Sequence, residues 1–236
     1  MSSQLFSPLT IGKVTFDNRL VVAPMCQYSC VDGVPGDWHL MHLGNFAVSG
    51  AGLVFVEATG VEPRAPITPG CPGLWNDEQE AAFARIIQFC RTHGTGKLGI
   101  QLGHAGRKAS ARAPWDGGTS IPPGEDKGWQ TIGPSAVPFT EDWTVPEEMT
   151  AADIADVRDA FVSSAERARR LGFDVVELHA AHGYLMSSFL SPLANKRTDE
   201  YGGSLENRMR FPLEVVRAVR AVWPEDRVLC VRFNGT

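Results

Sequence analysis

Short apolar segments alternate with amphipathic helical segments along most of the chain, and this alternation limits the fold more than any other feature. Apolar, β-branched runs that suit strands buried on both faces cover residues 20–23, 53–57, 98–102, 175–178 and 228–233. Segments with a helical period lie between them, at residues 38–49, 77–91, 151–171 and 205–222. This repeating order predicts an α/β fold with a parallel sheet.

Residue types that cap helices stand at the predicted helix ends. Thr150 precedes Ala-Ala-Asp, an N-cap followed by an acidic first turn, and Asn76 or Asp77 is placed to cap the second helix. Glycines fall where helices must turn into the next strand, at Gly50, Gly94 and Gly172. These signals support the predicted helices.

Two parallel-sheet architectures fit five strands and four helices. A (β/α)8 barrel needs eight of each in typically ~250 residues, so these 236 residues reach only about the fifth unit of one. An open doubly wound sheet is complete with five strands. However, no G-x-G-x-x-G follows the first strand, where a dinucleotide-binding sheet needs it.

One segment, residues 110–150, interrupts the strand–helix rhythm. It is rich in Pro, Gly and Trp and has no sustained periodicity, so we expect a long functional loop, commonly an active-site cover. Residues in or near it are weaker candidates for shaping a substrate pocket: His104, Trp115, Trp129 and Trp143.

Composition excludes several classes of protein and partner. With 43% hydrophobic and 21% charged residues the chain is an ordinary globular protein, neither disordered nor collagen-like. A net charge of −5 without a basic run favours neither nucleic acid nor an anionic membrane as partner. The N-terminus has no signal-peptide pattern, and no apolar run approaches the ~20 residues of a membrane span.

The five cysteines are odd in number and scattered, at Cys26, Cys30, Cys71, Cys90 and Cys230. This usage predicts reduced thiols in a cytoplasmic protein rather than a disulfide framework. Because no C-x-x-C is present, we expect neither an iron–sulfur cluster nor a structural zinc site.

The strongest candidate site follows the strand at 175–178, where H-A-A-H-G-Y places His179, His182 and Tyr184. Hydrogen-bonding side chains at the carboxyl end of a buried strand are typical of α/β active sites. Two neutral imidazoles can donate to one substrate oxygen while the tyrosine donates a proton. A metal site remains an alternative, since Glu177 lies on the same strand face as His179. A long polar loop is expected between Tyr184 and a helix that begins near Ser204.

Three other predicted strands end in groups suited to a flat ligand. In L-V-V-A-P-M-C-Q-Y, the backbone of residues 23–25 and the Cys26 sulfur either line such a ligand or belong to a core turn. Gln101 interrupts an apolar strand, so a ligand, a neighbouring strand or buried water must satisfy its amide. Arg232, near the end of the last strand, needs an electron-rich ligand or a buried carboxylate.

Together these motifs resemble the Old Yellow Enzyme family of FMN-dependent ene-reductases, within it the bacterial class called thermophilic-like. The resemblance covers nearly all of the chain, from L-F-S-P-L-T-I-G-K-V-T-F-D-N-R-L-V-V-A-P-M-C-Q-Y through Q-L-G-H-A-G-R-K and G-F-D-V-V-E-L-H-A-A-H-G-Y-L. The run S-F-L-S-P-L-A-N-K-R-T-D-E-Y-G-G-S-L-E-N-R is the most specific part. The resemblance implies a TIM (β/α)8 barrel, with about the first five βα units present in one domain over residues 1–236.

The resemblance also implies a role for individual residues. The flavin would be flanked by Ala23, Pro24, Met25 and Cys26, with Ala58 and Gln101 at its polar edge and Arg232 near its pyrimidine part. His179 and His182 would hold the substrate oxygen, Tyr184 would protonate the substrate, and Tyr28 and Lys108 would lie beside it. No metal is implied at this site.

The implied activity is reduction of activated C=C bonds in enones or nitroalkenes, with NADPH or NADH as reductant of FMN. The later strands and their phosphate-binding loops lie beyond the matched units, so we expect a complementing C-terminal segment or a homo-oligomer. The alternatives are a catalytically silent fragment that does not retain FMN, or a metal-dependent barrel hydrolase that uses His179 and His182.

Overall fold

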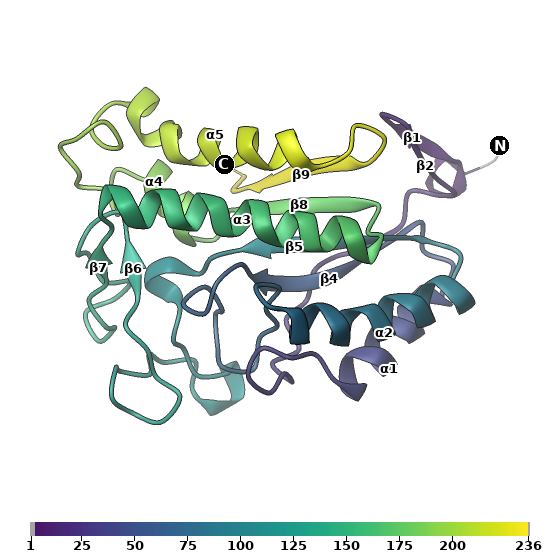
Figure 1. Cartoon of the computed structure of the whole chain (residues 1–236), viewed down its shortest axis with the longest axis horizontal. Helices are drawn as coiled ribbons and strands as arrows, with labels where there is room; N and C mark the ends of the chain where they lie inside the picture. The colour runs from purple at the N-terminus through teal and green to yellow at the C-terminus, as the bar shows by residue number, and fades with distance from the viewer. Residues whose placement is uncertain (1–2, 236) are drawn as a thin grey trace.

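A parallel five-stranded sheet forms the centre of the molecule (Figure 1). The computed structural model describes residues 3–235. The strands are β3 (Val21–Val22), β4 (Leu53–Gly60), β5 (Lys97–Gly103), β8 (Val175–Ala180) and β9 (Val228–Phe233). Each predicted strand is confirmed, and β9 has the predicted bounds.

The long helices are α1 (Asp37–Ala47), α2 (Asp77–His93), α3 (Ala151–Leu171) and α5 (Leu205–Val222). The predicted caps are confirmed where the side chains act: Asn76 accepts from the Gln79 N–H at 2.9 Å and Thr150 from the Asp153 N–H at 3.1 Å. Gly172 ends α3 in the left-handed conformation, with φ of 85°. None of the described helices combines the length and apolar character that a membrane span requires.

The order of the strands distinguishes the two architectures that the sequence allowed. The strands lie side by side in chain order, β3-β4-β5-β8-β9, without the reversal that a doubly wound sheet requires. Right-handed crossovers that all advance in one direction place their helices on one face of the sheet. The sheet is therefore part of a (β/α) barrel, and the doubly wound alternative is wrong.

The main core lies between this sheet and its helices. Phe83 of α2, Phe161 of α3 and Phe211 of α5 are fully buried in one cluster with Ile100 of β5 and Leu178 of β8. Burying such side chains stabilises the fold by roughly 1.5–3 kcal/mol each, which makes this contact the main favourable term. In Figure 1, α3 and α5 run alongside β8 and β9.

A hairpin that the sequence did not predict covers the amino ends of the strands. It consists of β1 (Leu9–Ile11) and β2 (Val14–Phe16), after a 3₁₀ turn at Gln4–Phe6. Val14 and Phe16 form a second, smaller core with Leu53, Phe55 and Val175. Short strands of three residues carry too little periodicity to be found in the sequence.

The loop expected between Tyr184 and Ser204 is shorter than predicted: a short helix, α4 (Leu185–Leu190), follows Tyr184 directly, and the loop occupies residues 191–204. Leu185, Met186 and Phe189 are buried on it. Six residues are too few for a helix to be stable alone, so tertiary burial decides this element. It fixes the turn that carries the candidate histidines.

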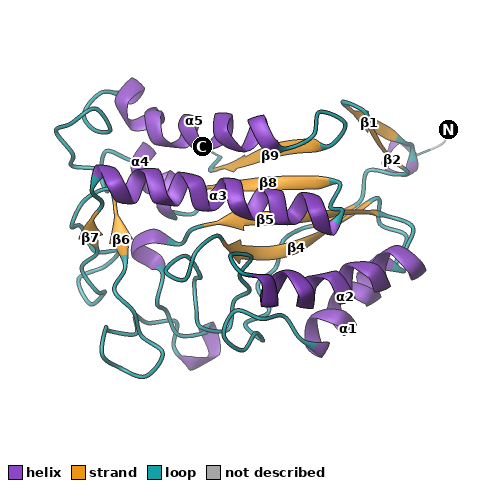
Figure 2. Cartoon of the chain, in the orientation of Figure 1, coloured by secondary structure: helices purple, strands orange, loops and turns teal. Residues whose placement is uncertain are grey.

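The segment 110–150 consists mostly of loop, as predicted (Figure 2), but it is not wholly irregular. It contains a 3₁₀ turn at Pro114–Asp116 and a short parallel pair formed by β6 (Ile132–Gly133) and β7 (Glu147–Glu148). Another 3₁₀ turn, Gly106–Lys108, follows β5.

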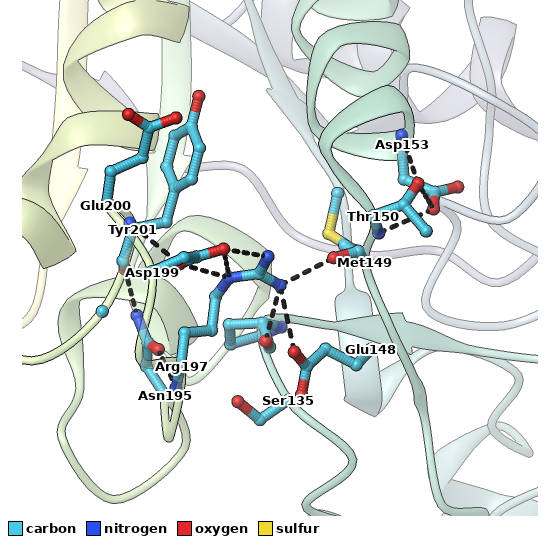
Figure 3. A network of polar contacts seen from close by, with 12 residues as sticks. Ser135, Glu148, Met149, Thr150, Asp153, Asn195, Arg197, Asp199, Glu200 and Tyr201 are labelled. Carbon is cyan, nitrogen blue, oxygen red and sulfur yellow. Dashed lines mark hydrogen bonds and ion pairs between the residues drawn. The ribbon is translucent and has the colours of Figure 1, made fainter.

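Arg197 joins the segment 131–150 to the loop after α4 (Figure 3). Its guanidinium donates to the carbonyl oxygens of Met149 at 2.6 Å and Pro134 at 3.1 Å. It also pairs with Asp199, at 3.0 Å from Nε. The Arg197 side chain is only 7% exposed. If it were removed, little water could reach the acceptor oxygens to take over its hydrogen bonds. Through Arg197 the loop after α4 is therefore joined to the segment 131–150, and we call this set of contacts the Arg197 clamp.

We expect Arg197→Lys to lower the free energy of unfolding by about 2 kcal/mol, because an ammonium group cannot reach both carbonyls and the carboxylate together. Urea unfolding followed by circular dichroism measures this change. Arg85→Lys is the matched control, since Arg85 is exposed and contacts only the exposed Asp37, so it should change stability by less than about 0.5 kcal/mol. Equal urea midpoints for the two variants would show that the Arg197 contacts do not stabilise the protein.

Candidate active site

The carboxyl ends of the parallel strands bring the predicted site residues to one edge of the sheet. Ala58 in β4 pairs in register with Gln101 in β5, and His179 in β8 pairs with Arg232 in β9. Cys26 follows β3 and receives a hydrogen bond from the Ala58 backbone. Segments far apart in the sequence therefore contribute to one site, as the sequence predicted.

His179, His182 and Tyr184 form a compact aromatic group. The ring centroid of His179 lies 4.9 Å from that of His182 and 4.8 Å from that of Tyr184. His182 adopts a left-handed backbone, with φ of 59°, and its N–H donates to the Asn234 side chain at 2.8 Å. Such strained backbone is common at functional sites. Residues 179–184 therefore direct three polar side chains toward one another.

His179 is a neutral hydrogen-bond donor. Its Nδ1 accepts the Ala181 N–H at 3.2 Å, so the ring proton lies on Nε2. Burial, followed by the charges of His182, Arg232 and Lys108, lowers the pKa of His179 to about 3. Burial and the charges of Arg232 and Lys108 also lower the pKa of His182. Both imidazoles therefore stay uncharged at neutral pH.

Two tyrosines near the histidines keep their protons. Burial, then the nearby charges of Cys26 and Tyr28, raise the pKa of Tyr184 well above its usual range. Burial raises the pKa of Tyr28 to about 12, with Cys26 and Cys71 contributing. A phenol that resists ionisation is available as a proton or hydrogen-bond donor.

Lys108 supports the turn that carries the histidines. Its Nζ donates to the His182 carbonyl oxygen at 2.9 Å and lies 5.1 Å from the centroid of the Tyr184 ring. Phe139, from the segment 110–150, packs on the other side, with its ring centroid 4.5 Å from Nζ. Burial and the charge of Arg107 lower the pKa of Lys108.

The residues predicted to flank a flavin form a partly open apolar edge beside this group. Ala23 and Met25 are exposed, and Pro24, Cys26 and Ala58 are half-buried. Ala58 is the half-buried position of β4, whose other residues are buried. An apolar surface with a sulfur atom and free backbone groups suits the face of a flat aromatic ring.

Arg232 and Gln101 differ in how far this chain already satisfies them. Among residues 3–235, no carboxylate lies within ion-pair distance of Arg232, so its charge is open to an electron-rich ligand. Gln101 is buried, and its Nε2 donates to Glu177 at 2.6 Å. The neighbouring strand, one of the alternatives left by the sequence, therefore satisfies this half of the amide.

The weaker pocket candidates divide into two groups. Trp115 and Trp129 line a cleft of about 700 Å³ next to Tyr28, and the Trp115 ring lies 5.3 Å from the Tyr28 ring. His104 is buried and lies 2.9 Å from a Glu62 oxygen, while Trp143 packs against Phe139. His179, His182 and Tyr184 are not among the residues that line this cleft.

The sequence analysis did not predict a second cluster of ligand-type side chains, which lies around Cys26. Glu57 and Cys71 lie close to its sulfur, and His39 contacts Glu57 at 3.2 Å. A glutamate that ends an apolar strand was the one available signal, because nothing in the spacing of Cys26 and Cys71 links them. In the described part of the chain, His179 and His182 do not join a third ligand-type side chain.

Comparison with known proteins agrees with this geometry. Residues 4–235 match the profile of the NADH:flavin oxidoreductase / NADH oxidase family. The chain is 47% identical to an NADH:flavin oxidoreductase of Gibberella zeae and 45% identical to an NADPH dehydrogenase of Geobacillus sp.. All of this chain aligns in both cases, over 57% and 64% of those proteins. The chain thus spans about three fifths of the length of these relatives.

Solved structures of similar proteins also match nearly all of this chain but only part of their own length. Morphinone reductase in complex with tetrahydroNAD superposes with a TM-score of 0.83 at 34% identity, over 98% of this chain and 64% of that one. The Old Yellow Enzyme from Pichia sp. superposes with a TM-score of 0.84 at 31% identity, over 98% and 59%. Sequence, fold and site geometry agree: the chain belongs to the Old Yellow Enzyme, or NADH:flavin oxidoreductase, family.

Proposed function

We propose that this chain carries the flavin- and substrate-binding residues of an NAD(P)H-dependent ene-reductase that acts on enones or nitroalkenes. The observation that carries the proposal is the pair of neutral imidazoles beside a tyrosine that keeps its proton. The names of the relatives, NADPH dehydrogenase and morphinone reductase with a bound tetrahydroNAD, support a nicotinamide as reductant. Because the chain spans about three fifths of those relatives, activity of the chain alone is part of the proposal.

The residues present fit FMN. Ala23, Pro24, Met25 and Cys26 offer an apolar edge with a sulfur atom, and Arg232 offers a cation that pairs with no carboxylate among residues 3–235. In the proposal these residues hold the ring system, with Ala58 and the free oxygen of Gln101 at its polar rim. When bound, FMN supplies hydride chemistry between the nicotinamide and the substrate.

The chain's own groups perform the polar part of the reaction. His179 Nε2–H and His182 donate hydrogen bonds to the carbonyl or nitro oxygen and stabilise the negative charge that develops there. Tyr184 gives its phenolic proton to the carbon alpha to that group. Tyr28 positions the substrate, and Lys108 holds the backbone turn between His182 and Tyr184.

The first test is titration of the purified chain with FMN, followed by anaerobic NADPH and then 2-cyclohexenone. We expect a flavin spectrum that bleaches with NADPH and recovers with the enone. Tyr184→Phe should leave FMN binding and bleaching unchanged but slow the recovery by about 10²–10⁴-fold, because only proton donation is lost.

A chain that stays colourless with added FMN would contradict the proposal for this chain alone and favour the silent-fragment alternative. Recovery at the wild-type rate in Tyr184→Phe would remove Tyr184 as the proton donor. Hydrolytic activity that is lost on chelation would instead favour the alternative of a metal-dependent hydrolase that uses His179 and His182.

The depressed pKa of His179 predicts how stability depends on pH. Between about pH 6.5 and pH 3 the unfolded chain binds a proton at this position that the folded chain does not. Stability is therefore lost as pH falls through this window, by up to about 1.4 kcal/mol per unit. We expect His179→Gln to remove this contribution, so that the variant loses less stability than wild type between about pH 6.5 and 5 in urea unfolding.

The control for this experiment is His93→Gln, at an exposed position near the end of α2. It should keep the wild-type pH dependence. The same slope in His179→Gln and wild type would show that His179 is not held neutral by the fold.

A further inference from the structure

Three ligand-type side chains from separate segments meet beside the strand ends. The Cys26 sulfur, a Glu57 carboxylate oxygen and the Cys71 sulfur all lie within 4.8 Å of one another. Glu57 and Cys71 are buried and Cys26 is half-buried. Two sulfurs and one oxygen at this spacing are a donor set typical of Zn²⁺.

The backbone holds these segments together closely. Glu57 lies where the register between β4 and β5 shifts, a bulge that redirects side chains. The segment before Cys71 packs against the segment after Cys26: Cys30 N–H donates to the Gly70 carbonyl oxygen at 2.9 Å. A Cβ on residue 70 would come within 2.5 Å of the Tyr28 carbonyl oxygen, so only glycine permits this approach. The cluster is therefore a rigid feature of the fold.

No lysine or arginine pairs with Glu57 among the side chains of residues 3–235. Its oxygens accept the Gln27 N–H at 2.9 Å and contact His39 Nε2 at 3.2 Å. The Nδ1 atom of His39 accepts the Gly36 N–H at 3.2 Å, so Nε2 faces Glu57 as a hydrogen-bond donor. Glu57 is 3% exposed, and one of its oxygens lies within 4.8 Å of both cysteine sulfurs, so it is placed to act as a ligand together with them.

Supporting contacts orient two of the three donors. His39 contacts Glu57, and Thr68 Oγ1 lies 3.4 Å from the Cys71 sulfur. Metal ligands are characteristically held by such outer contacts. The cleft of about 700 Å³ is lined by Cys71 and Cys30, and so provides a route for an ion from solvent.

We propose that Cys26, Glu57 and Cys71 form a binding site for a thiophilic divalent cation, Zn²⁺ being the chemical match. Two thiolates and one carboxylate bind the ion, water takes the fourth position, and binding releases the thiol protons. The sequence predicted no zinc site because no C-x-x-C is present, whereas the fold assembles the ligands from three segments. The proposal does not depend on flavin binding or on ene-reductase activity.

The test uses the full chain, reduced with a phosphine and freed of metal, and titrated with Co²⁺ and then Zn²⁺. We expect one equivalent of Co²⁺ to give the red-region bands of tetrahedral thiolate coordination, where flavins do not absorb, and Zn²⁺ to remove them. Cys71→Ser and Glu57→Gln should each weaken binding by at least about 10–100-fold. Cys90→Ser, a buried cysteine of α2 outside the cluster, should leave binding unchanged.

A second readout keeps the proposal testable if a variant fails to fold. In the wild-type chain, Zn²⁺ should protect Cys26 and Cys71, but not Cys90, from alkylation as mapped by mass spectrometry. Absence of the thiolate bands, bands that persist in Cys71→Ser, or equal alkylation with and without Zn²⁺ would overturn the site.

Discussion

Parallel pairing of strands in chain order is the constraint on which the rest of this structure depends. Each strand pairs with the one before it, so each carboxyl end reaches the same edge of the sheet. His179 and Arg232 are neighbours because β8 and β9 pair in register, and Ala58 and Gln101 are neighbours for the same reason in β4 and β5. A shift of one residue in either ladder would turn these side chains to the opposite face.

The electrostatics of the site follow from placing cations beside histidines that are withdrawn from water. Arg232 and Lys108 both disfavour protonation of His179 and His182, and burial acts in the same direction. The imidazoles are thus donors of hydrogen bonds rather than of protons. In the proposed reaction, proton transfer is therefore assigned to Tyr184, whose buried phenol holds its proton.

Much of this arrangement could be predicted from the sequence, for identifiable physical reasons. Thr150 and Asn76 cap helices locally, and the apolar runs of β5 and β8 are long enough to be recognised. By contrast, α4 forms because Leu185 and Phe189 are buried by tertiary contacts, and the β1–β2 hairpin depends on packing against Leu53 and Val175. The proximity of Cys71 to Cys26 depends on a loop–loop contact that no local pattern encodes.

The clamp at Arg197 has a consequence for motion. Because this buried guanidinium contacts both Met149 and Asp199, the segment 131–150 and the loop after α4 cannot separate without exposing unpaired carbonyl oxygens. The contacts of one side chain therefore hold the two segments in position relative to each other. Phe139, whose ring centroid lies 4.5 Å from Lys108 Nζ, is part of the segment 131–150, so a contact outside the histidine group helps to place a side chain beside it.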